Sequence, residues 1–106
     1  MEPKPTIGRI VHYTLSESDA EQINRRRTTG HSIKDRIDHD RWPLGAQAHI
    51  GNPVFVGQVI PAVVVNQFGD GSTLNLHCLL DGNDTFWALS RLEGGQPGNW
   101  CWPPRV

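Results

Sequence analysis

The sequence predicts a mainly β protein of the α+β type: a small five- to six-stranded antiparallel barrel or strongly bent sheet of SH3-like size, with a short-helix insertion after the first strand. Three runs of β-branched, aromatic and other apolar residues follow one another between residues 58 and 92, separated by turns of Gly, Asn and Asp. Eleven glycines and eight prolines in 106 residues are typical of turn-rich β proteins and disfavour a helical bundle. A chain of this length is expected to form one domain with a single modest core.

We expect this single domain to span residues 1–106 and to contain three parts. A flexible tail is predicted for residues 1–7, a helical or arm-like insertion for residues 16–57, and a β meander for residues 58–104. The first strand is predicted at residues 8–15, where the side chains alternate between two faces. On one of these faces we expect Val11, Tyr13 and Leu15.

The insertion begins with a predicted helix from Asp19 to Thr28. Ser18 and Glu21 have the spacing of a capping box, and Gly30 is placed to be the C-terminal cap. A carboxylate in the first turn and three arginines in the last turns suit the helix dipole. Because the helix has only two apolar anchors, it must lean on the sheet or on another subunit. The anchors are Ala20 and Ile23.

The rest of the insertion is predicted to be less regular. We expect His31 to Trp42 to form a second short helix or, alternatively, an irregular arm, and Pro43 ends it. Residues 46–50 and 54–56 are short extended pieces between glycines, and we interpret them as edge strands or a β-arm.

The meander and the end of the chain are predicted to contain four strands, at residues 58–65, 73–80, 85–92 and 99–102. The first of these strands is apolar on both faces, which predicts that it is covered on both sides. Pro61 lacks an N–H, so this part of the strand should lie at an edge or at a bulge. In the second of these strands the core face is expected to be formed by Leu74, Leu76, Cys78 and Leu80. In the first strand Ile60, Ala62 and Val64 are expected to lie opposite Val59, Val63 and Val65, and in the third Phe86, Ala88 and Leu92 opposite Trp87, Leu89 and Arg91.

No pattern of side chains indicates catalysis, a cofactor or a bound metal ion, and we expect the protein not to be an enzyme. The five histidines form no HxH, HExxH or Cys/His cluster, and no serine lies in a GxSxG context. The DGND sequence at residues 81–84 lacks the rest of a calcium loop and is interpreted as a hairpin turn. Cys78 and Cys101 are interpreted as core residues, with a cross-strand disulfide as the alternative.

The arginines of the insertion form the candidate ligand site. Guanidinium groups bind phosphate or carboxylate in a bidentate fashion, and an exposed tryptophan can stack on a base or fill a subunit interface. The alternative is a solvated helix end whose arginines pair with neighbouring carboxylates. The predicted ligand-binding residues are Arg25, Arg26, Arg27, Arg36 and Trp42, and the carboxylates of the alternative are Glu17, Asp19, Glu21, Asp35 and Asp38.

Net charge and hydropathy restrict the partners. The formal net charge is −1 at pH 7, so no basic field favours double-stranded DNA. No apolar run reaches the roughly 18 residues that span a bilayer, and the first residues lack the pattern of a signal peptide. We therefore expect a cytoplasmic protein without a membrane partner.

Several segments together resemble a family of small proteins encoded by tailed phages and prophages. These segments are GRIVHYTL, LSESDAEQINRRR, AQAHIGNPV, IPAVVV, LLDGNDTFWALS and PGNWCWPPR, which lie between Gly8 and Arg105 and extend over nearly the whole chain. The resemblance implies a phage origin and a place in the host cytoplasm, and it transfers no catalytic or ligand residues. A weaker similarity links the strand around Pro61 to PemK-type toxin ribonucleases, although Ile60 stands where those proteins have an arginine.

From these observations we expect a non-enzymatic, phage-encoded binding protein that forms homo-oligomers. One form of this hypothesis is a counter-defence protein that sequesters a small anionic nucleotide signal of the host. In that form the arginines of the insertion contact phosphates and a tryptophan stacks on a base. The alternatives are a structural component of the virion or of its assembly, and a protein inhibitor of a host enzyme.

Overall fold

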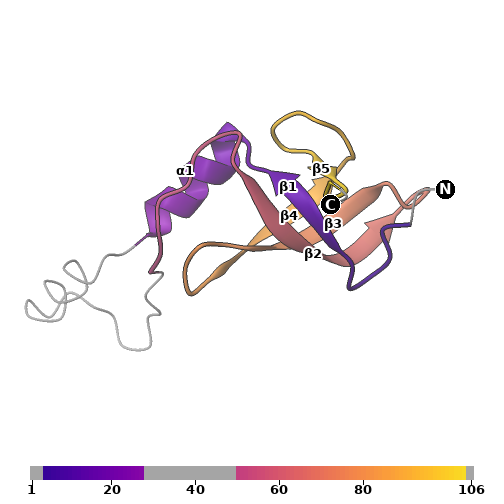
Figure 1. The fold of residues 1–106 in the computed structure, drawn as a ribbon, viewed down its shortest axis with the longest axis horizontal. Helices are drawn as coiled ribbons and strands as arrows, with labels where there is room; N and C mark the ends of the chain where they lie inside the picture. The colour runs from indigo at the N-terminus through magenta and orange to yellow at the C-terminus, as the bar shows by residue number, and fades with distance from the viewer. Residues whose placement is uncertain (1–3, 28–49, 105–106) are drawn as a thin grey trace, which may run out of the picture.

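A computed structural model describes residues 4–27 and 50–104 of the chain (Figure 1). It confirms the mainly β fold, with one helix after the first strand. All five described strands form one antiparallel sheet in the order β4-β3-β2-β1-β5. The sheet is twisted and is not closed into a barrel, so the open sheet is the observed architecture of the two that were predicted (Figure 1). The elements are β1 (Ile10–Thr14), α1 (Glu17–Arg26), β2 (Val59–Phe68), β3 (Thr73–Leu79), β4 (Thr85–Arg91) and β5 (Trp100–Cys101).

The two edges of the sheet meet at one corner. The chain after β4 contacts β5 through an isolated parallel bridge between Glu93 and Trp100. The amide of Trp100 donates to the carbonyl of Leu92 (3.1 Å), and the amide of Gly94 donates to the carbonyl of Trp100 (3.0 Å). Earlier in β4, among the described strands, the stretch from Thr85 to Leu89 pairs with β3 alone.

The helix begins two residues earlier than predicted, at Glu17, because Ser16 and Asp19 form the capping box. The Ser16 hydroxyl accepts a hydrogen bond from the amide of Asp19 (3.1 Å), and the Asp19 carboxylate accepts one from the amide of Ser16 (3.0 Å). Two amides at the helix start are satisfied in this way. The predicted box of Ser18 and Glu21 has the right spacing but lies inside the helix.

The helix also ends earlier than predicted, at Arg26. Arg27 is extended (φ −65°, ψ 135°), and its amide donates to the carbonyl of Asn24 (3.2 Å). Gly30, the predicted cap, lies outside the described residues, as does the second helix or arm predicted from His31 to Trp42.

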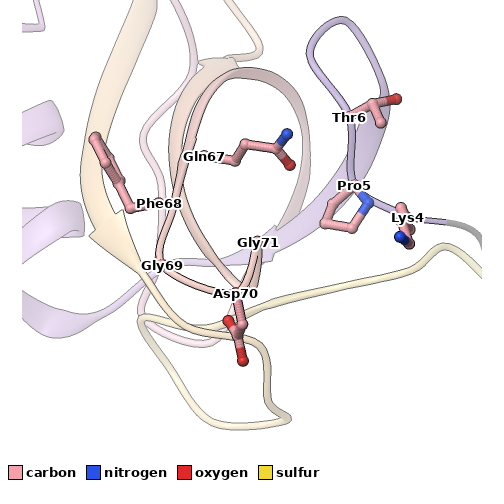
Figure 2. A pocket seen from close by; sticks show the side chains of 8 residues that line it. All are labelled: Lys4, Pro5, Thr6, Gln67, Phe68, Gly69, Asp70 and Gly71. Carbon is pink, nitrogen blue, oxygen red and sulfur yellow. The ribbon is translucent and has the colours of Figure 1, made fainter.

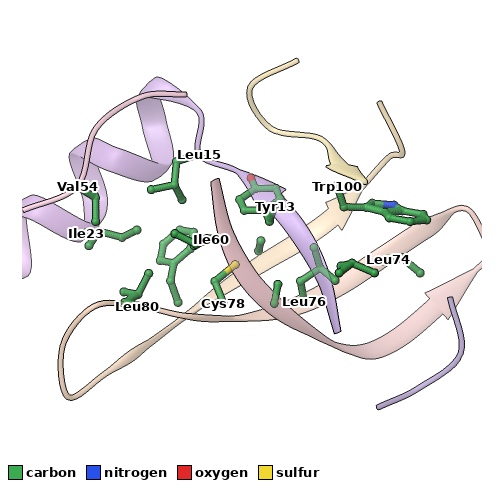
Figure 3. Packing of buried hydrophobic residues seen from close by; sticks show 14 of the residues in the cluster. Tyr13, Leu15, Ile23, Val54, Ile60, Leu74, Leu76, Cys78, Leu80 and Trp100 are labelled. Atoms are coloured by element: carbon green, nitrogen blue, oxygen red, sulfur yellow. The ribbon is translucent and has the colours of Figure 1, made fainter. Parts of the chain in front are cut away.

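One face of the sheet, here called the inner face, bears the core (Figure 3). Helix α1 contributes its two apolar residues to this core, so the predicted lean of the helix on the sheet is confirmed. The Asn24 side chain fixes the segment around Val54, since it donates to the Val54 carbonyl and accepts from the Val54 amide (both 2.8 Å). The buried apolar residues are Val11, Tyr13, Leu15, Ala20, Ile23, Val54, Ile60, Ala62, Val64, Leu74, Leu76, Cys78, Leu80, Phe86, Ala88 and Trp100.

The edge strand predicted at residues 54–56 is wrong. Gly57 has a φ of 85°, which glycine adopts readily, and the chain turns there. Its amide donates to the carbonyl of Leu15 (2.8 Å), and the amide of Gln58 donates to the carbonyl of Phe55 (3.1 Å). The segment is therefore a turn that leads directly into β2, and the remaining predicted piece, residues 46–49, lies outside the described residues.

Pro61 lies at a local edge of β2, as predicted. The backbone of Val64 bonds to the chain at Arg9 and Gly8, so the odd-numbered residues of this part of β2 direct their backbone groups toward β3. Pairing with β3 starts only at Ala62. The nitrogen of Pro61 therefore faces β3 at a position where β2 and β3 are not yet paired. For this reason the missing N–H removes no hydrogen bond from the sheet.

A β-bulge at Ser90 reverses the side-chain alternation in the last part of β4. Ser90 has a φ of 56°, and its amide donates to the side-chain oxygen of the buried Asn75 (2.8 Å). Beyond the bulge Arg91 lies opposite Leu74, which faces the core, and Leu92 is exposed. The prediction that Leu92 shares a face with Phe86 and Ala88 is therefore wrong, because strict alternation requires a strand without a bulge.

The opposite face of the sheet, here called the open face, is exposed. Val59 and Pro61 are exposed and Val63 is half-buried, although all three lie on the second apolar face of β2. The prediction that this strand is covered on both sides is wrong for the described chain. Apolar residues on one face of a strand indicate that the face suits a strand or an apolar contact. They do not specify which partner makes that contact.

Candidate functional site

The three consecutive arginines at the end of α1 do not share one environment. Arg25 is 71% exposed, and its guanidinium lies 3.3 Å from the carboxylate of Glu21, one turn earlier. This pair is one that the solvated-helix alternative expects. Exposed i, i+4 pairs contribute little to stability, so Arg25 can exchange Glu21 for another anion at small cost.

Arg26 and Arg27 both bind the carboxylate of Asp84, in the turn between β3 and β4, and we call these three residues the arginine clasp. Nη1 of Arg27 lies 2.6 Å from one carboxylate oxygen, and Nη2 of Arg26 lies 3.1 Å from the other. The side chains of Arg27 and Asp84 are more than nine-tenths buried. Arg26 also donates to the carbonyl of Thr85 (2.6 Å), and its guanidinium lies 5.7 Å from the centre of the Phe86 ring.

The clasp closes over a backbone contact between Gly51 and Gly82, which form an antiparallel bridge. A Cβ on Gly51 would lie 2.6 Å from the carbonyl oxygen of Asp81 and 2.8 Å from the guanidinium carbon of Arg27. A Cβ on Gly82 would lie 2.5 Å from the carbonyl oxygen of Ile50. Only glycine fits at both positions. The bridge connects the DGND turn to the segment that leads to β2, and the clasp connects the same turn to the end of the helix.

The predicted ligand site is thus divided. Arg26 and Arg27 are bound to Asp84 in the clasp, whereas Arg25 is exposed. Arg36 and Trp42 lie outside the described residues. The assignment of these five residues to a ligand stays a prediction. Sequence reasoning missed Asp84 as a partner because it follows Arg27 by 57 residues, and no local spacing signals such a contact.

A second polar cluster is centred on Asp19, which is fully buried. Its carboxylate accepts hydrogen bonds from the Tyr13 hydroxyl and from the Ser16 amide, and it lies 3.1 Å from Nη2 of Arg91. The Arg91 guanidinium also lies 5.7 Å from the centre of the Tyr13 ring. Burial, followed by the hydrogen bond to Asp19, raises the pKa of Tyr13 far above its usual value. This cluster ties the start of α1 to β1 and β4.

A shallow pocket of about 390 Å³ lies at the end of the sheet away from α1 (Figure 2). It is lined by Lys4–Thr6 and by the turn Gln67–Gly71, and none of these side chains is buried. The Asp70 carboxylate accepts from the amide and the hydroxyl of Ser72 (3.0 and 2.6 Å), and these hydrogen bonds lower the pKa of Asp70. The pocket therefore has exposed loop walls and no buried charge that would fix a ligand.

The open face presents a row of four side chains across four strands. Ile10 pairs with Val63, Val63 pairs with His77, and His77 pairs with Trp87. The Trp87 side chain is 58% exposed. We call this row, together with the exposed apolar residues around it, the apolar strip. The surrounding residues are Val59, Val65, Leu79 and Leu89.

The three tryptophans of the described chain lie in different environments. Trp100 is buried and its indole nitrogen donates to the carbonyl of Ser72 (2.9 Å), while Trp102 packs edge-on against it with ring centres 5.9 Å apart. Trp87 is the exposed indole of the described chain, and Trp42 lies outside it. The indole left at the surface is thus on the open face.

In the described parts of the chain, no group of three or more His, Cys, Asp or Glu side chains is placed to hold a metal ion. No helix in these parts is long and apolar enough to cross a bilayer. Cys78 and Cys101 are free thiols, so the alternative of a disulfide is not observed. Comparisons with protein-family models, with curated proteins and with solved structures found no match. The resemblance to phage proteins accordingly stays a prediction.

Proposed function

We propose that this chain is a non-enzymatic binding protein that acts as an assembly component, and that the open face of its sheet makes the protein contact. The apolar strip supports this proposal, because Ile10, Val63 and Trp87 lie in one row across the sheet. Extended exposed apolar patches mark interaction sites on soluble proteins. Tryptophan is also among the residue types most enriched in the energetic centres of interfaces.

The size of the apolar strip suits a protein partner. Its six most exposed apolar side chains have exposures between 38% and 58%. Together they present on the order of 500 Å² of apolar surface, a large part of the about 800 Å² per partner that a standard interface buries. Sites for small molecules are concave pockets, whereas this strip extends over a sheet face.

Sedimentation velocity across a dilution series tests the contact. We expect the wild-type chain to associate as its concentration rises, and Trp87→Ser to shift the association to higher concentration. Phe55→Ser is the matched control, because Phe55 is equally apolar and exposed but lies in the turn before β2. Equal behaviour of the two variants, or a wild-type chain that stays monomeric at every concentration, would contradict self-assembly through the open face.

The resemblance to phage proteins gives the assembly proposal its biological form, a component of a phage particle or of its assembly intermediate. Mass spectrometry of purified particles tests this form. A constant copy number per particle supports a structural role. Absence from both particles and intermediates rules it out and leaves inhibition of a host enzyme, which one co-purifying host protein would indicate.

Sequestration of a small anionic nucleotide is the second candidate. One observation favours it: the guanidinium of Arg25 is 71% exposed and pairs with the exposed carboxylate of Glu21, an anion that a phosphate can replace at small cost. A guanidinium for phosphate and an indole for a base are the groups that such a ligand needs. The two candidates compete for Trp87, since an indole buried between subunits is closed to a base.

Isothermal titration with a panel of cyclic and linear nucleotides tests the second candidate. We expect binding heat that is lost in Trp87→Ser and weakened in Arg25→Ser, because Arg25 is the exposed arginine of the cluster. Arg9→Ser is the control, as Arg9 is exposed and lies outside the helix. No heat and no thermal shift across the panel would remove this candidate.

A further inference from the structure

The strand β4 forms one edge of the sheet, and its outward backbone groups can be identified from the hydrogen-bond pattern. Val64 bonds to β1, so the backbone groups of Val63 point to β3. His77, which pairs with Val63, therefore points its backbone groups to β2, and its neighbour Leu76 points them to β4. Ala88 pairs with Leu76, so the backbone groups of Ala88 point back into the sheet. The N–H and C=O groups of Trp87 and Leu89 therefore point away from the sheet.

Two contacts limit the length of this exposed edge. At its start, the outward carbonyl of Thr85 already accepts a hydrogen bond from Arg26 (2.6 Å). At its end, the bulged Ser90 turns its amide to the side chain of Asn75 (2.8 Å). Between them the backbone groups of Trp87 and Leu89 have no hydrogen-bond partner within the described parts of the chain, and we call these four groups per chain the free edge.

We propose that two copies of this chain pair antiparallel through β4, about a twofold axis at Ala88. This inference rests on the proposed function: it names a second copy of the chain as the partner, and it places the contact at the β4 edge of the open face, where Trp87 and Leu89 lie. Trp87 then lies opposite Leu89 of the second copy, and each donates its N–H to the carbonyl of the other. Four backbone hydrogen bonds form, and every group of the free edge is satisfied.

The side chains of β4 suit this pairing. Trp87 and Leu89 are 58% and 51% exposed on the open face, so each indole packs beside a leucine of the second copy. Arg91 is the one charged residue of β4, and it is bound to Asp19. Natural edge strands are usually protected by lysine, proline or inward-pointing charges. None of these protections occurs between Thr85 and Leu89.

The opposite edge explains why pairing stops at two copies. The edge strand β5 has only two residues and is followed by Pro103 and Pro104, which lack an N–H. A second long pairing edge is thus missing from the described strands. Pairing β4 with β4 uses the same surface on both copies, which gives a closed dimer and no filament.

Mixed-chain disulfide trapping tests the register. Trp87→Cys and Leu89→Cys are made separately in a Cys101→Ser background, because Cys78 is buried and does not compete. Residues paired by hydrogen bonds across antiparallel strands have Cα atoms about 5.5 Å apart, within the range of a disulfide. Identical positions lie two residues out of register, beyond the about 7 Å limit.

We expect a cross-linked dimer when the Trp87→Cys and Leu89→Cys chains are mixed under oxidising conditions, and none from either chain alone. Cross-linking of either chain with itself would overturn the register. No cross-link in the mixture, from a protein that sedimentation shows to be dimeric, would overturn pairing through β4 and leave assembly through the open face intact. Both positions are exposed, and circular dichroism checks that both variants are folded.

Discussion

The two faces of the sheet are built from the same strands, yet only the inner face is completed by the described chain. On the inner face Val54 and the two apolar residues of the helix join the buried core, and the buried carboxylate of Asp19 has three partners. The open face has apolar residues of similar type, including Ile10 and Trp87, without a cover. A strand sequence therefore determines which residues share a face, but it does not determine what covers that face.

The inner face also contains the polar contacts that fix the position of its cover. Asp19 joins the start of the helix to β1 and β4, and the arginine clasp joins the end of the helix to the turn between β3 and β4. Buried polar groups require partners of defined geometry, so these two contacts specify one arrangement of helix on sheet. Among the described residues, no buried ion pair of this kind lies on the open face, and its apolar residues are exposed.

The largest expected effect is on the inner face, from Asp19→Ala. This change leaves the Tyr13 hydroxyl and the Arg91 guanidinium without their buried acceptor, and breaking a buried ion pair from one side costs about 3–5 kcal/mol. Urea unfolding measures the loss. Glu17→Ala is the control, because Glu17 is exposed in the same turn and favours the helix dipole by about 0.3–1 kcal/mol. Equal losses for the two variants would contradict a central role for Asp19.

The arginine clasp should give the next largest effect. Asp84→Ala leaves Arg27 buried without its carboxylate and frees Arg26, and we expect a loss of about 2–3 kcal/mol in the free energy of unfolding. The matched control is Glu21→Ala, which breaks the exposed pair with Arg25 and should change stability by less than about 1 kcal/mol. A loss no larger than that of the control would show that the turn, and not the clasp, holds the helix end.

Alkaline pH should destabilise the inner face, because its buried thiol and phenol hold their protons more tightly than they do in the unfolded chain. Burial raises the pKa of Cys78 to about 12 from its usual 9.0, and burial also raises the pKa of Tyr13. Above pH 9.0 the unfolded chain releases the thiol proton while the folded chain keeps it. The contribution of the thiol to stability is therefore complete below pH 9.0 and falls by about 1.4 kcal/mol per pH unit as pH rises toward the folded pKa. The corresponding loss from Tyr13 begins only above its usual pKa of 10.0.

Urea unfolding at a series of alkaline pH values measures this slope. In Cys78→Ala the contribution of the thiol is absent, so stability should fall less steeply above pH 9.0, whatever its value at neutral pH. An unchanged slope in the variant would contradict the protonated, buried state of Cys78.

Local sequence patterns were sufficient for the strands and for the inner face. The alternation of Val11, Tyr13 and Leu15 was confirmed, since period-2 order is a property of neighbours in one strand. The bulge at Ser90 broke that order in β4. The bulged Ser90 bonds to the side chain of Asn75 on the adjacent strand, a partner that the sequence of β4 does not contain.

The candidate site was less accessible to sequence reasoning because its contacts are long-range. Asp19 was read as a first-turn residue, and its bond to Arg91 joins positions 72 residues apart. The DGND turn was read as hairpin chemistry, while its last residue binds Arg27 across 57 residues. Contacts of this kind follow from the register of the sheet, and two equally plausible registers would pair these charges differently.

The smallest expected effect is that of Trp87→Ala, and Phe86→Ala at the adjacent buried position is the reference for it. Phe86 is buried on the inner face and Trp87 is exposed on the open face. We expect Phe86→Ala to cost about 3–5 kcal/mol in the free energy of unfolding, and Trp87→Ala to change it by no more than about 0.5 kcal/mol in dilute, monomeric protein. Urea unfolding of both variants measures the contrast. A loss for Trp87→Ala that approaches that of Phe86→Ala would mean that the folded monomer itself covers the open face.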